Sequence, residues 1–367
     1  MKAVQSSSKW LFYLVVLPTT LLLCAWQSWS WWSWASAPPL APATASDAPE
    51  KMVQIKIPPG TSAQQIGRDL KSAGLIRSTL AWNLWARWLR LQNKAEFQAG
   101  TYELSPTQSL SAIASQIGTG GVVQLSFTIP EGWSLRQMAA YFESQGLFKA
   151  ENFLAAATKV PRDQFPWLPA GLPHVEGFLY PDTYQVATGS ITPDAVINLM
   201  LKRFEQVALP IYDQARANKQ TQFKLLEWAT LASIVEKEAV VPTERRRIAG
   251  VFFQRLQRGI KLEADPTVEY GLNIQQTPDR PLTFKQVRTS SPYNTYVNRG
   301  LPPTPIASPG KASLEATVNP ENTDYLFFVA RYDGTHVFSR TLAEHEAAVR
   351  AIRRERETRR QATPQPN

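Results

Sequence analysis

An uncharged segment near the start is the feature that most constrains this chain. No charged residue occurs from Trp10 to Ser46, and Lys2 and Lys9 precede that segment. Its first half is almost wholly apolar, and its second half adds five tryptophans between Trp26 and Trp34. An apolar helix of about 20 residues spans a bilayer, and tryptophan gathers at membrane interfaces. We therefore expect a cytoplasmic tail over residues 1–9 and a transmembrane helix over residues 10–34.

The charges around this segment also predict its orientation. Positive charge before a span and none directly after it favours a cytoplasmic N-terminus and an exported body. A cleaved signal peptide is the alternative, with Ala35-Ser36-Ala37 as the cleavage site. The apolar segment is longer than the 7 to about 15 residues usual in signal peptides, which favours a retained single-pass anchor. The proline- and alanine-rich residues 35–50 then form a linker.

Composition excludes several classes of site. The single cysteine, Cys24, permits no intrachain disulfide and no cysteine cluster. The three histidines, His174, His336 and His345, show no ligand spacing, so we expect no metal site. The net charge of +9 owes much to an arginine-rich C-terminal tail, and it would suit an anionic polymer or lipid headgroups. No nucleic-acid-binding motif accompanies the charge, so no nucleic acid is expected as a partner.

An internal repeat organises the first part of the body. Residues 55–75 align with residues 127–147, and both copies begin with a short apolar stretch and a turn that contains proline and glycine. Both continue into an apolar helical pattern and close on Ser-x-Gly-Leu. Each copy therefore predicts a strand, a turn, a serine-capped helix and a glycine stop.

The remaining patterns predict an α+β fold with two folded parts. A strand at 100–106 and a helix at 110–117 complete a small αβ module over residues 51–126, of a kind that binds glycan chains or serves as a plain spacer. Residues 127–349 form a mixed α+β domain with helices at 191–207, 223–239 and 244–256. Asp333-Gly334 predicts a hairpin between strands at 325–329 and 336–339. The basic tail at 350–367 is expected to be disordered or, alternatively, to be a solvated helix end.

Glu238 is the strongest candidate for a chemical role. On a helix over 223–239 it falls on the same face as Leu231 and Ile234 or Val235, so a carboxyl group ends an apolar stripe. Burial disfavours the charged form of such a group and raises its pKa, as a general acid requires. Glu236 lies beside the same stripe and competes for the role. The alternative is a helix end with both acids in water.

Four further segments, at 175–184, 262–268, 291–296 and 300–303, have the composition of a cleft lining. They combine aromatic rings with acids and amides near glycine and proline, as sugar-binding sites do. The alternative is that these residues only stiffen loops. The candidate binding residues are Glu176, Tyr180, Asp182, Asp265, Tyr293, Asn294 and Tyr296.

Taken in order, these segments resemble the endolytic murein transglycosylase family, also called YceG-like. The resemblance runs from about Val53 to Val349, and it rests on ordered blocks at family-like spacing. The blocks are EGFLYPDTY at 176–184, ASIVEKEA at 232–239, ADPTVEYG at 264–271, SPYNTY at 291–296, RGLPPTPIASPG at 299–310 and SLEATVNPENTDYLFFVA at 313–330.

The resemblance implies a single membrane anchor, a LysM-like module and a transglycosylase domain over 127–349. It places the catalytic glutamate at the second acid of EKE, which is Glu238 and not Glu236. It further implies non-hydrolytic cleavage between N-acetylmuramic acid and N-acetylglucosamine, which leaves a 1,6-anhydro end. No cofactor is implied.

The resemblance also implies a location and partners. The enzyme would sit in the bacterial plasma membrane with its catalytic domain outside the cytoplasm, and peptidoglycan glycan strands would be its substrate. Peptidoglycan synthases or other elongation and division proteins are candidate partners.

Two other functions were weighed. A non-catalytic wall-binding scaffold would leave Glu238 without a role. A pyridoxal-dependent aminodeoxychorismate lyase would need a phosphate-binding loop, and no glycine-rich loop of that kind occurs in the sequence.

Overall fold

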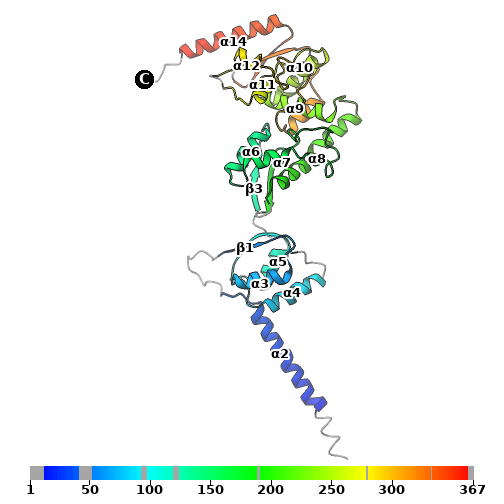
Figure 1. The fold of residues 1–367 in the computed structure, drawn as a ribbon, viewed down its shortest axis with the longest axis vertical. Coiled ribbons are helices and arrows are strands. Elements are labelled where there is room, and N and C mark those ends of the chain that lie inside the picture. The colour runs from blue at the N-terminus through cyan, green and yellow to red at the C-terminus, as the bar shows by residue number, and fades with distance from the viewer. Residues whose placement is uncertain are drawn as a thin grey trace, which may run out of the picture. The chain divides into compact units, whose positions relative to one another are not determined.

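The computed structural model describes residues 12–40, 52–91, 97–118, 124–187, 191–277, 280–331 and 333–362. The chain divides into two compact units (Figure 1). Unit 1 comprises residues 1–126 with 185–191, and unit 2 comprises residues 127–184 with 192–367.

The N-terminal segment forms one continuous helical stretch. A π-helical turn, η1 (Phe12–Val16), leads into α2 (Leu17–Ser36). Within the described ranges, however, no helix is both long and apolar enough to cross a membrane. The transmembrane helix expected over 10–34 is therefore not supported by its described residues. α2 has 20 residues, but serine and glutamine alternate with tryptophan in its second half and lower its mean hydropathy.

The end of α2 packs against unit 1. Ala35 is fully buried in the core of that unit, and the Trp32 ring stacks on Trp85 with 6.1 Å between centroids. The Leu40 N–H donates to the Pro106 carbonyl over 3.1 Å. The first residues of the expected linker therefore lie against unit 1, and residues 41–50 fall outside the described residues.

Unit 1 is built on a two-stranded antiparallel sheet covered by helices. β1 (Val53–Ile57) pairs with β2 (Gly100–Leu104), with Ile55 opposite Tyr102. Between them the chain forms α3 (Ala63–Ser72) and α4 (Thr79–Leu91), and α5 (Leu110–Gly118) follows β2. The strand expected at 100–106 and the helix expected at 110–117 are confirmed as β2 and α5, whereas likeness to a LysM module remains a prediction.

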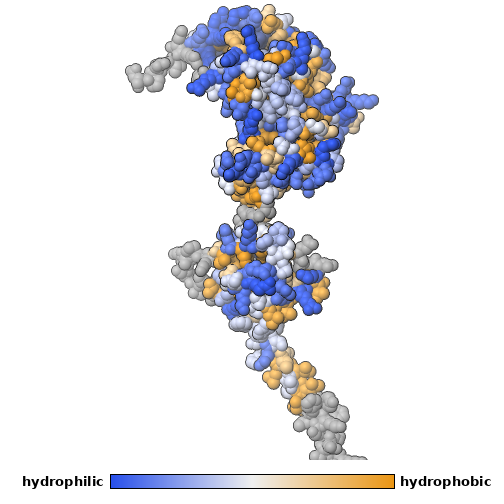
Figure 2. Space-filling view, in the orientation of Figure 1, coloured by the Kyte–Doolittle hydropathy of each residue, from blue (hydrophilic) through white to orange (hydrophobic). Residues whose placement is uncertain are grey.

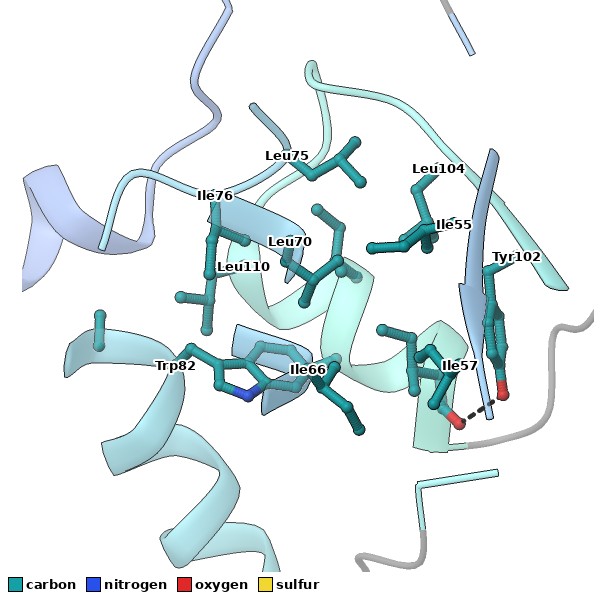
Figure 3. Close-up of a cluster of buried hydrophobic side chains, with 14 of the residues drawn as sticks. Ile55, Ile57, Ile66, Leu70, Leu75, Ile76, Trp82, Tyr102, Leu104 and Leu110 are labelled. Atoms are coloured by element: carbon teal, nitrogen blue, oxygen red, sulfur yellow. Dashed lines mark hydrogen bonds between the residues drawn. The ribbon is translucent and has the colours of Figure 1, made fainter. Parts of the chain in front are cut away.

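The core of unit 1 gathers aliphatic side chains around two buried rings (Figure 3). Trp82 is fully buried, and its Nε1–H donates to the Ala63 carbonyl over 2.7 Å. Gly67 makes this packing possible because a Cβ at that position would lie 2.4 Å from Trp82 Cδ1. α3 and α4 therefore meet at a contact that only glycine permits.

The internal repeat is confirmed in both copies. Ser62 caps α3, and Ser134 caps α6 (Leu135–Ser144), each accepting a hydrogen bond from the third residue of its helix. The turn before each helix and the stop after it contain glycines with positive φ, where residues with a side chain are strained. These glycines are Gly60 and Gly74 in the first copy, and Gly132 and Gly146 in the second.

Unit 2 is mostly helical. Its hairpin pairs β5 (Phe327–Ala330) with β6 (His336–Ser339), and β3 (Gln124–Thr128) pairs with β4 (Thr183–Ala187), two strands whose residues are divided between the units. Its helices besides α6 are α7 (Ala150–Ala157), α8 (Pro193–Ala217), α9 (Leu225–Glu238), the 3₁₀ turn η2 (Pro242–Glu244), α10 (Arg245–Gln257), α11 (Asp265–Leu272), α12 (Phe284–Val287), α13 (Lys311–Val318) and α14 (Leu342–Ala362).

α9 is the central helix of unit 2. Every residue from Trp228 to Val235 is buried, and the helix contacts α10, α11 and α13. The Trp228 indole N–H donates to the Leu314 carbonyl over 3.2 Å, and the Ser233 hydroxyl accepts from the Ile306 N–H over 3.1 Å. This packing on all sides fixes the direction in which the end of α9 projects.

The predicted hairpin is confirmed, and the basic tail is helical over its described part, in agreement with the alternative of a solvated helix end. β5 and β6 pair antiparallel on either side of Gly334. α14 then continues to Ala362 instead of ending near residue 350. Its arginine, glutamate and alanine residues favour helix, and Glu346 pairs with Arg350 one turn later at 3.6 Å.

Candidate functional site

A cleft of about 1140 Å³ lies within unit 2. The start of α6 contributes Ser134, Arg136 and Gln137, and the end of α9 contributes Lys237 and Glu238. α11 and the segment after it supply Asp265, Glu269, Tyr270 and residues 273–277. Further lining comes from Tyr296, the β5–β6 hairpin and α14. The volume exceeds what one sugar ring needs and suits an elongated ligand.

Glu238 is the last residue of α9 and lines this cleft. Burial and, to a smaller extent, the nearby carboxylates of Asp265 and then Glu269 together raise the pKa of its carboxyl to about 8. The residue is partly exposed and lines the cleft, so a ligand bound there can contact it. Glu238 is therefore protonated at neutral pH and accessible, which are the two properties of a general acid.

Glu236 projects elsewhere. Its Oε2 accepts a hydrogen bond from the Gly310 N–H at the start of α13, over 3.1 Å. Its electrostatic neighbour there is Glu131, whose pKa is raised by burial and then by Glu236. Glu236 is not among the residues that line the cleft. Two residues along a helix turn a side chain by about 200°, so the two acids face different surroundings.

Asp265 lies at the first position of α11 and also lines the cleft. The Tyr296 hydroxyl donates to Asp265 Oδ1 over 2.6 Å, and Gln276 Nε2 lies 3.4 Å from Oδ2. The proline after Asp265 occupies the first turn of α11, where a helix tolerates proline. Two donors thus hold the Asp265 carboxylate beside Glu238.

Sequence reasoning missed two groups that shape the cleft. Glu269 lies one turn after Asp265 on α11, and its Oε1 accepts from the Gln276 N–H over 2.5 Å. Arg136 donates to the Tyr270 carbonyl and to Asn273 Oδ1, each over 3.2 Å. The spacing of four residues between Asp265 and Glu269 was a usable signal, because it places both acids on one helical face. Arg136 carried no such signal.

Glu176 lies behind the cleft wall. It is 1% exposed, and both of its oxygens accept from the Leu135 N–H at the start of α6, over 3.0 and 3.1 Å. Its Oε2 also accepts from the Tyr270 hydroxyl over 3.0 Å. Burial raises the pKa of this carboxyl to about 8, and these hydrogen bonds oppose the rise. Glu176 therefore joins α6 to α11, two helices that both contribute to the lining.

Tyr293 and Asn294 do not line the cleft either. The Tyr293 ring packs 4.8 Å from that of Tyr270, and its hydroxyl lies 2.8 Å from Thr304 Oγ1. Asn294 is buried and donates to the carbonyls of Val287 and Thr289 over 3.0 and 2.7 Å. The Asn294 side chain also accepts from the Tyr296 N–H over 2.9 Å. Asn294 thereby fixes the loop that presents Tyr296.

Tyr180 and Asp182 are also absent from the cleft lining. The Tyr180 carbonyl accepts from the Tyr184 hydroxyl, and Asp182 pairs with Arg203 at 2.6 Å. Of the eight residues selected from sequence, the cleft therefore brings together three, namely Glu238, Asp265 and Tyr296. Across the described residues, no group of three or more His, Cys, Asp or Glu side chains is arranged to hold a metal ion.

The YceG-like family matches residues 55–351 of the chain, which include the whole cleft lining except Arg356. The chain belongs to the YceG-like family. It is 35% identical over 312 residues to an endolytic murein transglycosylase of Bacillus subtilis, covering 81% of this chain and 83% of that protein. It is 32% identical over 330 residues to an endolytic murein transglycosylase of Streptococcus pneumoniae, covering 82% of this chain and 58% of that protein.

A solved YceG-like structure shares the fold. The crystal structure of a putative yceG-like protein from Listeria monocytogenes is 31% identical and superposes with a TM-score of 0.56. The match covers 82% of this chain and 99% of that one. The mixed α+β architecture of the YceG-like chain is therefore shared over most of its length.

Proposed function

We propose that this chain is an endolytic lytic transglycosylase that cleaves murein glycan strands, with Glu238 as its acid and base. The observation that carries the proposal is the Glu238 carboxyl group, protonated at neutral pH, at the end of a buried helix and in the lining of a cleft of about 1140 Å³. The names of the relatives from Bacillus subtilis and Streptococcus pneumoniae support the substrate class.

The reaction requires one proton donor that later becomes a proton acceptor. The Glu238 carboxyl donates its proton to the glycosidic oxygen as the bond from that oxygen to C1 of N-acetylmuramic acid breaks. The Glu238 carboxylate then takes the proton of the C6 hydroxyl, and O6 bonds to C1 to close the 1,6-anhydro ring. No water is consumed, and Glu238 ends protonated as it began.

Asp265 and Tyr296 are proposed to assist this step. A carboxylate beside the reacting carbon stabilises the positive charge that develops on the sugar ring. The hydrogen bond from Tyr296 and the Gln276 amide hold Asp265 as an acceptor, so it is placed to act by charge or to orient the C6 hydroxyl. In most glycosidases a second carboxylate instead attacks C1 or activates water.

Mass spectrometry of the products tests the reaction and the catalytic residue together. Purified glycan strands are treated with the wild-type chain and with Glu238→Gln, and Glu236→Gln serves as the matched control. We expect internal cleavage to 1,6-anhydro ends by the wild type and the control, and a loss of at least about a hundredfold in Glu238→Gln. Reducing ends would mean hydrolysis, and binding without cleavage would favour the scaffold function.

We further propose that the enzyme acts on the outer side of the plasma membrane and terminates nascent strands. The lysines before the uncharged segment and the exposed leucines of α2 support attachment of the N-terminal segment to a membrane. An attached enzyme reaches only strands close to the membrane, where peptidoglycan synthases would be its neighbours. Longer glycan strands in cells that carry Glu238→Gln are expected, and unchanged strand lengths would contradict the termination role.

A further inference from the structure

α4 of unit 1 carries an apolar stripe on its exposed face. Leu80, Leu84, Trp88 and Leu91 are 57%, 46%, 46% and 79% exposed. Their spacing of four, four and three residues places them on one side of the helix. The side that packs on the unit is already filled by buried residues such as Trp82. A contiguous exposed stripe of this kind marks an interaction surface.

The charges along α4 indicate what covers this stripe. The helix contains no acidic residue, and Arg87 and Arg90 are exposed. Arginine can bury its aliphatic stem along an apolar surface while the guanidinium reaches a phosphate. Leucine, tryptophan and arginine together are the composition of helices that lie in the plane of an anionic bilayer interface. A membrane surface therefore matches both the apolar stripe and the positive charge.

The stripe is continuous with exposed tryptophans of α2. The Trp85 ring of α4 connects the two helices. Its centroid lies 6.1 Å from that of Trp32 in α2 and 4.9 Å from that of Trp88 in the stripe. Near the end of α2, Trp29 and Trp34 are exposed, and the Arg77 guanidinium lies 5.9 Å from the Trp34 ring centroid. Figure 2 shows hydrophobic surface along α2 and on unit 1 over α4. α2 and α4 thus present one tryptophan-rich surface.

We propose that α4 lies in the headgroup layer of an anionic phospholipid bilayer, with Leu80, Leu84, Trp88 and Leu91 among the upper acyl chains. A lipid surface fits α4 because apolar side chains and guanidinium groups lie together on this helix. α4 has no acidic side chain, which a basic protein partner would require. This inference does not depend on murein cleavage in unit 2.

A fluorescent label on α4 tests this placement in the full chain. Cys24 is the only cysteine, so Cys24→Ser provides a background for single cysteines at Leu84→Cys or Trp88→Cys. Lys71→Cys, on the exposed side of α3, is the matched control. Each chain carries an environment-sensitive dye and is mixed with vesicles of phosphatidylcholine and phosphatidylglycerol that contain a headgroup-level lipid quencher. The vesicles are recovered by flotation, and dye emission is measured on the chains that float with them.

We expect blue-shifted, quenched emission at positions 84 and 88 and little quenching at position 71. Equal quenching at all three positions, or none at 84 and 88, would overturn the proposal. A chain that does not float at all would overturn it too. Emission that shifts with protein concentration in the absence of vesicles would assign the stripe to a second copy of the chain.

The arginines provide a second test. Replacing Arg87 and Arg90 by glutamine should weaken binding to the vesicles that contain phosphatidylglycerol. At low salt we expect the apparent partition coefficient to fall about fivefold for each arginine, and quenching to fall with it. On pure phosphatidylcholine the same double variant should match its parent. If the loss is equal on both vesicle types, the arginines support the fold of α4 and do not bind headgroups.

Discussion

Two glutamates of unit 2 have similar raised pKa values and different surroundings. Burial raises the pKa of Glu176 and of Glu238 to about 8 in both cases. Glu176 is enclosed and hydrogen-bonded to a backbone N–H and a tyrosine hydroxyl, whereas Glu238 faces the cleft beside two carboxylates. Accessibility, and not acidity, therefore separates the proposed chemical role from the structural one.

The first residue-scale prediction concerns the pH dependence of cleavage. Glu238 must be protonated to act as an acid, so cleavage should fall as pH rises through about 8. Asp265 contributes to that raised pKa, so removing its charge lowers the pKa of Glu238. In pH–rate profiles of Asp265→Asn, the alkaline limb should move to lower pH, whatever its effect on the maximal rate.

Glu269→Gln is the control for this shift. It removes a carboxylate that contributes less to the pKa of Glu238 than Asp265 does, so its alkaline limb should move in the same direction by a smaller amount. An unmoved limb in Asp265→Asn would show that the limb does not report Glu238.

A second residue-scale prediction links Glu176 to stability. Its pKa in the folded state, about 8, lies above the ordinary value of 4.5, so folding keeps a proton that the unfolded chain releases. Stability is therefore full below pH 4.5 and falls as pH rises towards 8, with a slope of roughly 1.4 kcal/mol per pH unit for one such group. Denaturant unfolding of Glu176→Gln should show a shallower fall over this range.

Glu176→Ala is the informative contrast. It leaves the Leu135 N–H and the Tyr270 hydroxyl without their acceptor, so it should destabilise unit 2 and also reduce cleavage. A stable, fully active Glu176→Ala would contradict the role of Glu176 in holding α6 to α11.

At the scale of elements, Gly177 controls how the loop after Glu176 meets the loop before α13. Its φ is +81°, and an added Cβ would lie 2.2 Å from Pro305 Cβ. Gly171, in the same connection, has φ +75° and nothing within 4 Å. Gly177→Ala should therefore cost about 1–3 kcal/mol more than Gly171→Ala, because it adds overpacking to the same backbone strain. Equilibrium denaturation of both variants measures the difference.

Sequence patterns predicted the elements whose signals are local. The two copies of the repeat, α9 and the β5–β6 hairpin follow from caps, glycines and apolar spacing, all within a few residues. The apolar stripe on α9 predicted a carboxyl group at its end, whereas the choice of Glu238 over Glu236 came from the family resemblance.

The binding residues were harder to predict because a polar loop has the same composition whether it faces a ligand or the backbone. Asn294 and Tyr296 are two residues apart, yet Asn294 bonds to the loop carbonyls and Tyr296 lines the cleft. Tertiary contacts alone distinguish them. The basic tail was ambiguous because its charge favours solvation, while its alanine and arginine residues also favour helix.

At the scale of the whole molecule, the two units have separate cores and should respond separately to core substitutions. Gly67→Ala would force a methyl group against Trp82 at 2.4 Å, whereas Gly118→Ala, also in unit 1, meets nothing within 4 Å. In thermal unfolding followed by calorimetry, Gly67→Ala should lower one transition by several degrees, and Gly118→Ala should change it little. Cleavage of free glycan strands below that transition should remain at the wild-type rate, and a loss would show that unit 2 depends on unit 1.

The duplicated strand, turn and capped helix has a consequence for how the chain is assembled. In each copy the helix forms from contiguous residues, but the strand must wait for a partner that is synthesised later: β2 for β1, and β4 for β3. Contacts close in sequence form sooner than distant ones. The chain is synthesised from its N-terminus, so β1 can pair with β2 before the residues that line the cleft, all of which follow β3, have been synthesised. The first copy can thus fold completely while the strand of the second copy still lacks its pairing strand. The repeated motif would therefore let the two units fold one after the other.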